Sequence, residues 1–292
     1  MSTAVYGPNE AVLREFLNAS DWRAELYLPN GCGARVPAIV IINSSAGVCD
    51  IRERFYARFF SERGIAALVV DSFGLRGVTN TIEDQSLVPD QLLEADAYEA
   101  FELLARDHRI DADSIGIMGV SKGGQIALNT SLAVRRQWFH RPWADFAAHI
   151  ALAPPAHMQQ RNARTNGRPI LLLLAERDDF TGVDAPMEYA RRMAKAGNPR
   201  IRTRVYRGAH HAWELTGPVV FLEKAENYSR CHFLVEDDGS LTDRDTQRRM
   251  TLDVFFLKRS DYLYHGAHAG GGTEELKHDA AMEILNFFHA CL

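Results

Sequence analysis

The chain lacks long apolar runs, paired cysteines and a strong charge of either sign. Its longest apolar run, Ile170–Ala175, is far too short to cross a bilayer. Its four cysteines are scattered without a C-x-x-C pair, which is typical of reduced thiols in a cytosolic protein. A net charge of −5 is no general reason to bind nucleic acid or an anionic membrane. Residues 1–10 show neither the basic stretch nor the apolar core of a secretory signal. We therefore expect a cytoplasmic protein without nucleic-acid or membrane partners.

The sequence also lacks internal repeats, low-complexity linkers and a convincing set of metal ligands. His265 and His268 form an H-x-x-H pattern in a glycine-rich loop, but no further ligands complete a metal site. We expect a single domain over residues 1–292, with no metal and no cofactor. The sequence leaves the oligomeric state open, including a homo-oligomer.

Stretches of strand length alternate with stretches of helical periodicity. Residues 65–70 and Ile170–Ala175 are continuously apolar, as expected for strands buried on both faces of a sheet. The alternation predicts a mostly parallel central sheet flanked by helices on both faces. Further strands are predicted at 23–28, 37–43, 115–119, 146–152 and 201–206, and helices at 51–63, 90–106, 122–135, 185–196 and 274–292.

Residues 213–271 interrupt this alternation. The segment is polar and contains short turn signals such as D-D-G-S at 237–240. We interpret it as an insertion before the C-terminal helix that elaborates one end of the sheet, not as a separate domain.

A serine between glycines marks one strand-to-helix transition. Residues 119–123 read G-V-S-K-G, the G-x-S-x-G pattern of a nucleophile elbow. A predicted strand precedes Ser121 and a predicted helix follows it, as the elbow requires. The backbone N–H of Lys122 would then lie at a helix N-terminus, where it can face an oxyanion. The alternative is that Ser121 only caps the helix.

A nucleophilic serine needs a base to accept its proton and an acid to orient that base. In this architecture the chain order is serine, acid, histidine. Acidic residues follow Ile170–Ala175 directly, at the strand end where α/β sheets have their active sites. Asp178 is the preferred acid, with Asp179 and Glu176 as alternatives.

Two Gly-Ala-His stretches offer candidates for the base. His210 and His211 follow the strand 201–206, whereas His268 lies in the insertion. Chain order favours the first stretch, because the base should follow the strand after the acid. Adjacent loop residues point in different directions, so His210 and His211 are not both expected to face Ser121.

Four motifs occur in one order along the chain: D-S-F-G-L-R-G at 71–77, G-V-S-K-G-G at 119–124, L-L-A-E-R-D-D at 173–179 and Y-R-G-A-H-H-A-W at 206–213. Together they resemble the α/β-hydrolase fold and, within it, the dienelactone-hydrolase-like family. The resemblance runs from about residue 24 to residue 215 and resumes in the last helix. The family pattern Gly-Ala-x-His-x-aromatic implies that His211 is the base that serves Ser121 and Asp178.

The resemblance also implies a second oxyanion donor. Residues 42–47 follow an early strand where the family supplies a backbone N–H, and Ser45 is the matching position beside Lys122. Arg76, in the loop after the strand 65–70, could bind a substrate carboxylate bidentately. Its alternative role is to anchor its own loop through backbone carbonyls or Asp84.

The function that follows is a metal-independent serine hydrolase that cleaves a small ester or lactone through an acyl-enzyme. Position 121 is serine where the best-known dienelactone hydrolases carry cysteine, so their substrate is not carried over. The insertion is longer than in compact members, and we expect it to cover the site and reshape specificity. The alternatives are a non-catalytic ligand-binding protein of this fold, or acyl transfer or peptidase-like use of the same triad.

Overall fold

A computed structural model describes residues 3–5, 12–18, 22–31 and 35–292. Cys32 and most of the first eleven residues lie outside the described residues. Within those residues, no helix has both the length and the apolar character needed to cross a membrane.

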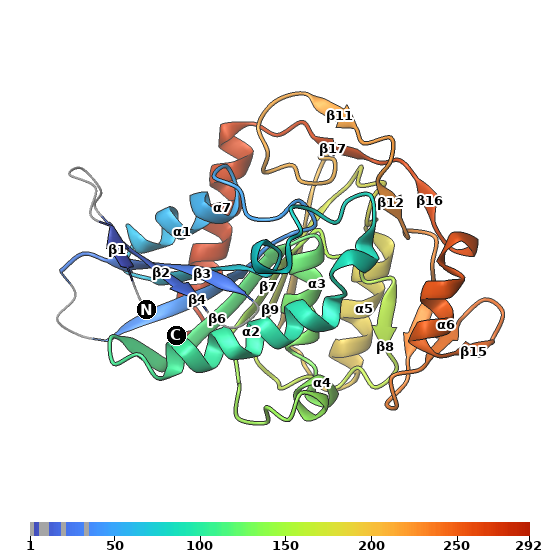
Figure 1. Cartoon of the computed structure of the whole chain (residues 1–292), viewed down its shortest axis with the longest axis horizontal. Coiled ribbons are helices and arrows are strands. Elements are labelled where there is room, and N and C mark those ends of the chain that lie inside the picture. Colours follow the sequence, from blue (N-terminus) through green and yellow to red (C-terminus); the bar gives the residue numbers. More distant parts are fainter. Residues whose placement is uncertain (1–2, 6–11, 19–21, 32–34) are drawn as a thin grey trace.

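A nine-stranded sheet runs through the centre of the described structure (Figure 1), in the spatial order β1-β2-β3-β5-β4-β6-β7-β9-β10. Neighbouring strands from β5 through β10 pair in parallel, whereas β1, β2, β3 and β5 pair antiparallel. The strands are β1 (Thr3–Val5), β2 (Val12–Asn18), β3 (Arg23–Pro29), β4 (Val36–Ile42), β5 (Ala66–Asp71), β6 (Ile110–Val120), β7 (His149–Leu152), β9 (Ile170–Ala175) and β10 (Ile201–Tyr206).

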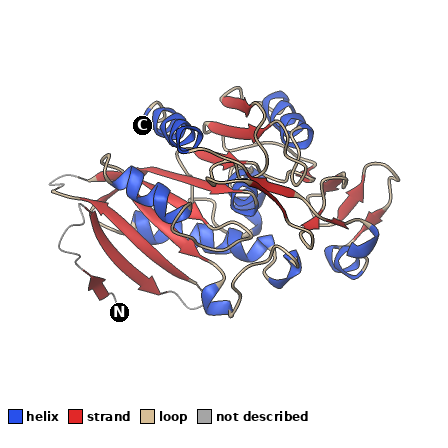
Figure 2. Cartoon of the chain, turned by 90° about the horizontal axis from the view of Figure 1, so that it is seen from above, coloured by secondary structure: helices blue, strands red, loops and turns tan. Residues whose placement is uncertain are grey.

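Helices cover both faces of this sheet (Figure 2). On one face, α1 (Glu53–Ser61) and α7 (Glu274–His289) enclose a core that includes Phe60 and Phe288. On the other face, α2 (Asp90–Ala105), α3 (Lys122–Asn129) and α5 (Asp184–Lys195) pack over alternate residues of the same strands. The predicted α/β-hydrolase architecture, a mostly parallel sheet between two helical layers, is confirmed.

One predicted helix is wrong in its extent. The helix expected over 122–135 ends at Asn129, and a separate helix, α4 (Ala133–Trp138), follows. The hydroxyls of Thr130 and Ser131 donate hydrogen bonds to the carbonyls three residues earlier, at 3.0 and 2.6 Å. Such side-chain bonds compete with helix propagation, and Leu132 then adopts an extended backbone.

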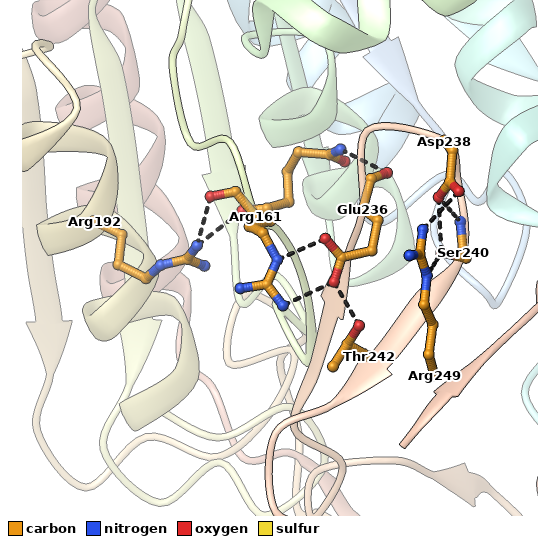
Figure 3. Close-up of polar contacts among 8 residues, drawn as sticks. Arg161, Arg192, Glu236, Asp238, Ser240, Thr242 and Arg249 are labelled. Carbon is orange, nitrogen blue, oxygen red and sulfur yellow. Dashed lines mark hydrogen bonds and ion pairs between the residues drawn. The ribbon is translucent and has the colours of Figure 1, made fainter. Parts of the chain in front are cut away.

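The segment after β10 builds small sheets at one end of the molecule (Figure 1). Its largest sheet has the order β15-β14-β13-β8, so it incorporates a strand that precedes β9 in the chain. Figure 3 shows Arg161, just after β8, facing Glu236, and two hydrogen bonds of 2.6 and 2.8 Å join them. The elements are β8 (Met158–Gln160), β11 (Val219–Phe221), β12 (Glu226–Asn227), β13 (Phe233–Val235), β14 (Leu241–Asp243), β15 (Arg249–Met250), α6 (Leu252–Leu257), β16 (Tyr264–His265) and β17 (His268–Gly270), with short 3₁₀ turns at Gly74–Arg76, Gln85–Leu87 and Arg259–Asp261.

Candidate active site

Ser121 occupies a sharp, strained turn between β6 and α3. Its φ of 56° lies in the left-handed region, which costs a non-glycine residue of order 1–3 kcal/mol. Neighbouring backbones press on the turn, since a Cβ on Gly119 would lie 2.3 Å from the backbone of Gly123. The Ser121 side chain makes no capping hydrogen bond to α3 among the described residues. The turn therefore does not serve as a serine-capped helix start, the alternative that the sequence left open.

Asp178 and His211 lie together in the loops that follow β9 and β10. The Nδ1 atom of His211 is 2.8 Å from Oδ2 of Asp178, and both residues are buried. The backbone N–H groups of Phe180 and Thr181 donate to the other carboxylate oxygen at 2.9 and 2.8 Å. The Thr181 hydroxyl donates to Oδ2 at 2.7 Å. These donors orient the carboxylate toward the imidazole.

Asp178 and His211 each shift the pKa of the other. Burial would raise the pKa of Asp178, but the charge of His211 and the hydrogen bonds from Thr181 hold the pKa of that carboxyl below its ordinary value. Burial would lower the pKa of His211, but the Asp178 carboxylate outweighs it and raises the pKa above 6.5. His211 therefore holds a proton more readily than an isolated imidazole, as a general base requires.

The rival acids and histidines have other partners. Asp179 accepts hydrogen bonds from the backbone and from Nδ1 of His268 at 2.8 and 2.7 Å, and both side chains are nearly half exposed. Glu176 accepts from the backbone N–H of Gly208 at 2.8 Å. The ring of His210 lies 5.9 Å from that of His268. The candidate acids and histidines thus form two Asp–His pairs, and of these two the Asp178–His211 pair is the buried one.

The loop after β4 positions Ser45 beside the elbow. The carbonyl of Ser45 accepts from Thr81 N at 2.7 Å, and its hydroxyl donates to the Gln85 side chain at 3.0 Å. Lys122 begins α3, and N–H groups in a first helical turn have no intrahelical acceptor. Ser45, Ser121 and Lys122 all line one cavity.

Gln85 connects these residues and was not predicted. Its side-chain oxygen accepts from the hydroxyls of Ser45 and Thr81 and from Nζ of Lys122, at 3.0, 3.2 and 3.3 Å. Its backbone N–H donates to Glu226 of the insertion at 2.8 Å. Gln85 lies within the loop 71–89, where no local sequence pattern singles out one glutamine.

Arg76 lies outside the set of residues that line this cavity. Its guanidinium makes two hydrogen bonds to Asp96, at 2.6 and 2.8 Å, and one to the Ser72 carbonyl at 2.6 Å. These contacts match the anchoring role. Of the two anchors considered, a backbone carbonyl is present at Ser72, and the carboxylate that Arg76 binds is Asp96, while Asp84 lies 3.2 Å from Arg259.

A buried charged cluster behind the site was also missed. Arg52 is 2.9 Å from Glu53 and 3.6 Å from Glu214, and all three residues are buried. Arg52 also donates to the hydroxyl of Ser44 at 2.5 Å. The cluster joins the loop bearing Ser45 to the loop bearing His211. Burial raises the pKa of Glu214, although the charge of Arg52 opposes this shift.

The cavity beside Ser121 has a volume of about 760 Å³. Core elements supply part of its lining, and the insertion supplies Glu226, Tyr228 and residues of β13, β14 and α6. The insertion therefore forms part of the wall of this cavity. No group of three or more His, Cys, Asp or Glu residues in the described part of the chain is arranged to hold a metal ion.

A profile of the dienelactone hydrolase family matches residues 22–230, which include the elbow, the acid loop and the histidine loop. The chain belongs to the dienelactone hydrolase family. This membership places it in a family of ester-hydrolysing enzymes.

Two characterised proteins are similar in sequence to part of this chain. The polyketide transferase claH of Penicillium crustosum is 31% identical over 135 residues, which are 45% of this chain and 43% of that protein. Human acyl-coenzyme A thioesterase 6 is 29% identical over 118 residues, 40% of this chain and 25% of that protein. The matches thus span less than half the length of either relative.

Solved structures show the same fold at low identity. The native Est2 esterase of Thermogutta terrifontis aligns with a TM-score of 0.56 and 17% identity, covering 70% of this chain and 84% of that chain. MGS-M1, an α/β-hydrolase enzyme from a Medee basin deep-sea metagenome library, aligns with a TM-score of 0.56 and 14% identity, covering 71% and 86%. These likenesses establish the α/β-hydrolase fold of this dienelactone hydrolase family member.

Proposed function

We propose that the protein is a metal-independent serine hydrolase that cleaves a carboxylic ester or lactone through an acyl-enzyme. The observation that supports this most strongly is the strained Ser121 turn beside a large cavity. Strain of this kind persists where the surrounding structure enforces it, and it gathers at active sites. A protein that only bound its ligand would have no use for a nucleophile presented in this way.

In the proposed reaction, the Ser121 hydroxyl oxygen attacks the substrate carbonyl carbon while His211 accepts the hydroxyl proton. Asp178 stabilises the imidazolium that forms. The backbone N–H groups of Lys122 and Ser45 hold the oxyanion of the tetrahedral intermediate. His211 then gives its proton to the leaving alcohol, and the acyl group remains on Ser121.

Water completes the cycle. It attacks the acyl-enzyme carbonyl while His211 again accepts a proton, and collapse of the second intermediate returns that proton to Ser121 and releases the acid. No step of this proposed reaction requires a cofactor or a metal. We further propose a cytoplasmic protein whose partner is a small-molecule ester or lactone, with no nucleic-acid or membrane partner.

The test is hydrolysis of a panel of aryl esters, lactones and acyl-peptides by the wild type and by Ser121→Ala. We expect release of acid from at least one ester or lactone, and loss of nearly all of it in the variant. Equal rates in the two proteins would refute the role of Ser121. Turnover of acyl-peptides alone would refute ester specificity.

Acyl transfer is the second candidate, and the relationship to a polyketide transferase favours it. The same acyl-enzyme would then react with an acceptor alcohol or amine in place of water. Product analysis by mass spectrometry with added acceptors separates the two. A transferase would form mainly the new ester or amide, whereas a hydrolase would form mainly the free acid.

A further inference from the structure

Aromatic side chains make up half of the apolar residues that line the cavity beside Ser121. The rings come from Trp138, Phe139, Phe180, Tyr228, Phe255 and Phe256. Aromatic surfaces of this kind favour flat ligands, which can stack on them or meet their edges. A volume of about 760 Å³ lies well within the range of sites for drug-sized ligands. An acetyl or methyl group would leave most of this space unused.

The wall is built into the fold. Trp138 and Phe139 come from the end of α4, while Phe255 and Phe256 come from α6 in the insertion. Phe255 packs against Phe233 of β13 with ring centroids 5.4 Å apart. The β13–β14 hairpin is tied to the segment after β8 by Arg161 and Glu236 (Figure 3). These contacts tie the insertion's part of the aromatic wall to the segment that follows β8.

The charged groups that line the cavity near α3 and α4 have partners within the protein. Arg135 pairs with buried Glu94 at 3.2 Å, and its guanidinium lies 4.8 Å from the Trp138 ring. Lys122 Nζ donates to the Gln85 carbonyl at 3.1 Å and lies 3.5 Å from Asp90. Within the described lining, both cations thus already have partners in the protein. This arrangement favours an uncharged ligand over a carboxylate.

We propose that the substrate is a neutral ester that bears an aromatic group of at least bicyclic size, on either the acyl or the alcohol side. The aromatic wall holds this group while Ser121 attacks the carbonyl. The inference rests on the proposed function and narrows its substrate class.

Three esters without other reactive groups test the size preference. Methyl acetate is the small reference, methyl 2-naphthylacetate has a bicyclic acyl group, and 2-naphthylmethyl acetate has a bicyclic alcohol group. Burial of apolar groups in the transition state raises kcat/KM by roughly fourfold per methylene-sized unit. We expect at least one naphthyl ester to exceed methyl acetate about 100-fold in kcat/KM, measured by pH-stat titration. The ester that does so identifies the side on which the large group sits.

A matched pair of variants on α6 tests the wall itself. Leu252 lines the cavity, whereas Leu257 on the same helix is 84% exposed and does not. In Leu252→Trp the indole fills part of the cavity, and we expect the naphthyl-to-methyl ratio of kcat/KM to fall at least tenfold. Leu257→Trp should keep the wild-type ratio. Thermal melting of both variants verifies that they fold.

The two proposals fail in different ways. If no ester, methyl acetate included, is hydrolysed in a Ser121-dependent manner, the proposed function is refuted. If Ser121-dependent hydrolysis occurs but both naphthyl esters stay within tenfold of methyl acetate, only the substrate class is refuted. An unchanged ratio in folded Leu252→Trp would also overturn the aromatic wall as its cause.

Discussion

Two neighbouring aspartates each hold a histidine from a different Gly-Ala-His stretch. Asp178 holds His211 at 2.8 Å in a buried setting, and Asp179 holds His268 at 2.7 Å in an exposed one. The hydrogen-bond distances alone do not separate the pairs. Burial separates them, because the interaction between two charges is stronger where water is excluded. We therefore propose that the base belongs to the buried pair.

Substitution of the two adjacent histidines tests this assignment. We expect His211→Ala to lose roughly 10⁴-fold or more in kcat, as removal of a triad histidine does elsewhere. His210→Ala should keep a measurable fraction, because the ring of His210 lies beside His268 and not beside Asp178. The measurement is kcat for the best ester of the panel. A larger loss in His210→Ala, or abolition by His268→Ala alone, would contradict the assignment.

The pH profile tests the coupling of His211 to Asp178. His211 acts as a base only when neutral, and its pKa lies above 6.5 because of the Asp178 carboxylate. The acid limb of kcat/KM should therefore have its midpoint above pH 6.5, with activity rising as pH rises through it. Asp178→Asn removes the charge, so we expect the midpoint to move to lower pH and kcat to fall by about 10⁴. A wild-type midpoint below 6.5, or one unmoved in the variant, would contradict this coupling.

At the scale of elements, loops from distant parts of the sequence meet around Gln85. It bonds the loop after β4, the first residue of α3 and, through Glu226, the insertion. Arg259 adds a second link, since it contacts Ser86 at 2.8 Å and Glu226 at 3.4 Å. The loop 71–89 therefore connects the proposed oxyanion donors to the insertion, which lines part of the cavity.

Gln85→Leu tests this connection. The substitution leaves the hydroxyls of Ser45 and Thr81 without their acceptor, which should cost about 1–3 kcal/mol in the free energy of unfolding. Displacement of the Ser45 loop should also lower kcat roughly tenfold to hundredfold. Urea unfolding and ester hydrolysis give both values. Gln137→Leu, the same change at an exposed position of α4, is the control, and equal effects in the two variants would contradict a role for Gln85.

Features that arise from a short stretch of sequence could be predicted, whereas features that depend on residues far apart in the chain could not. The Ser121 elbow, the acids after β9 and the alternation of strands and helices arise from short stretches of sequence. The contact of Arg52 with Glu214 and that of Gln85 with Glu226 join residues more than 140 positions apart. No local pattern reports such contacts. The end of α3 at Asn129 was missed for a different reason, since apolar periodicity continues through Thr130 and Ser131 while their hydroxyls end the helix.

At the scale of the whole molecule, the sheet and the insertion contribute different parts of the candidate site. The sheet brings Ser121, Asp178 and His211 to the same edge, because parallel strands end there. The insertion builds onto β8 and lines part of the cavity beside Ser121. The assignment of a triad and the assignment of a substrate class therefore depend on different parts of the chain.

The central claim is that Ser121 is the nucleophile, and covalent labelling tests it most directly. An organophosphorus reagent is a suitable probe, because it reacts covalently with an activated serine hydroxyl. Intact-mass spectrometry after treatment with a fluorophosphonate should show one adduct per chain, mapped to the peptide that contains Ser121 and absent from Ser121→Ala. No adduct on the wild type, or an adduct that persists in Ser121→Ala, would contradict the account.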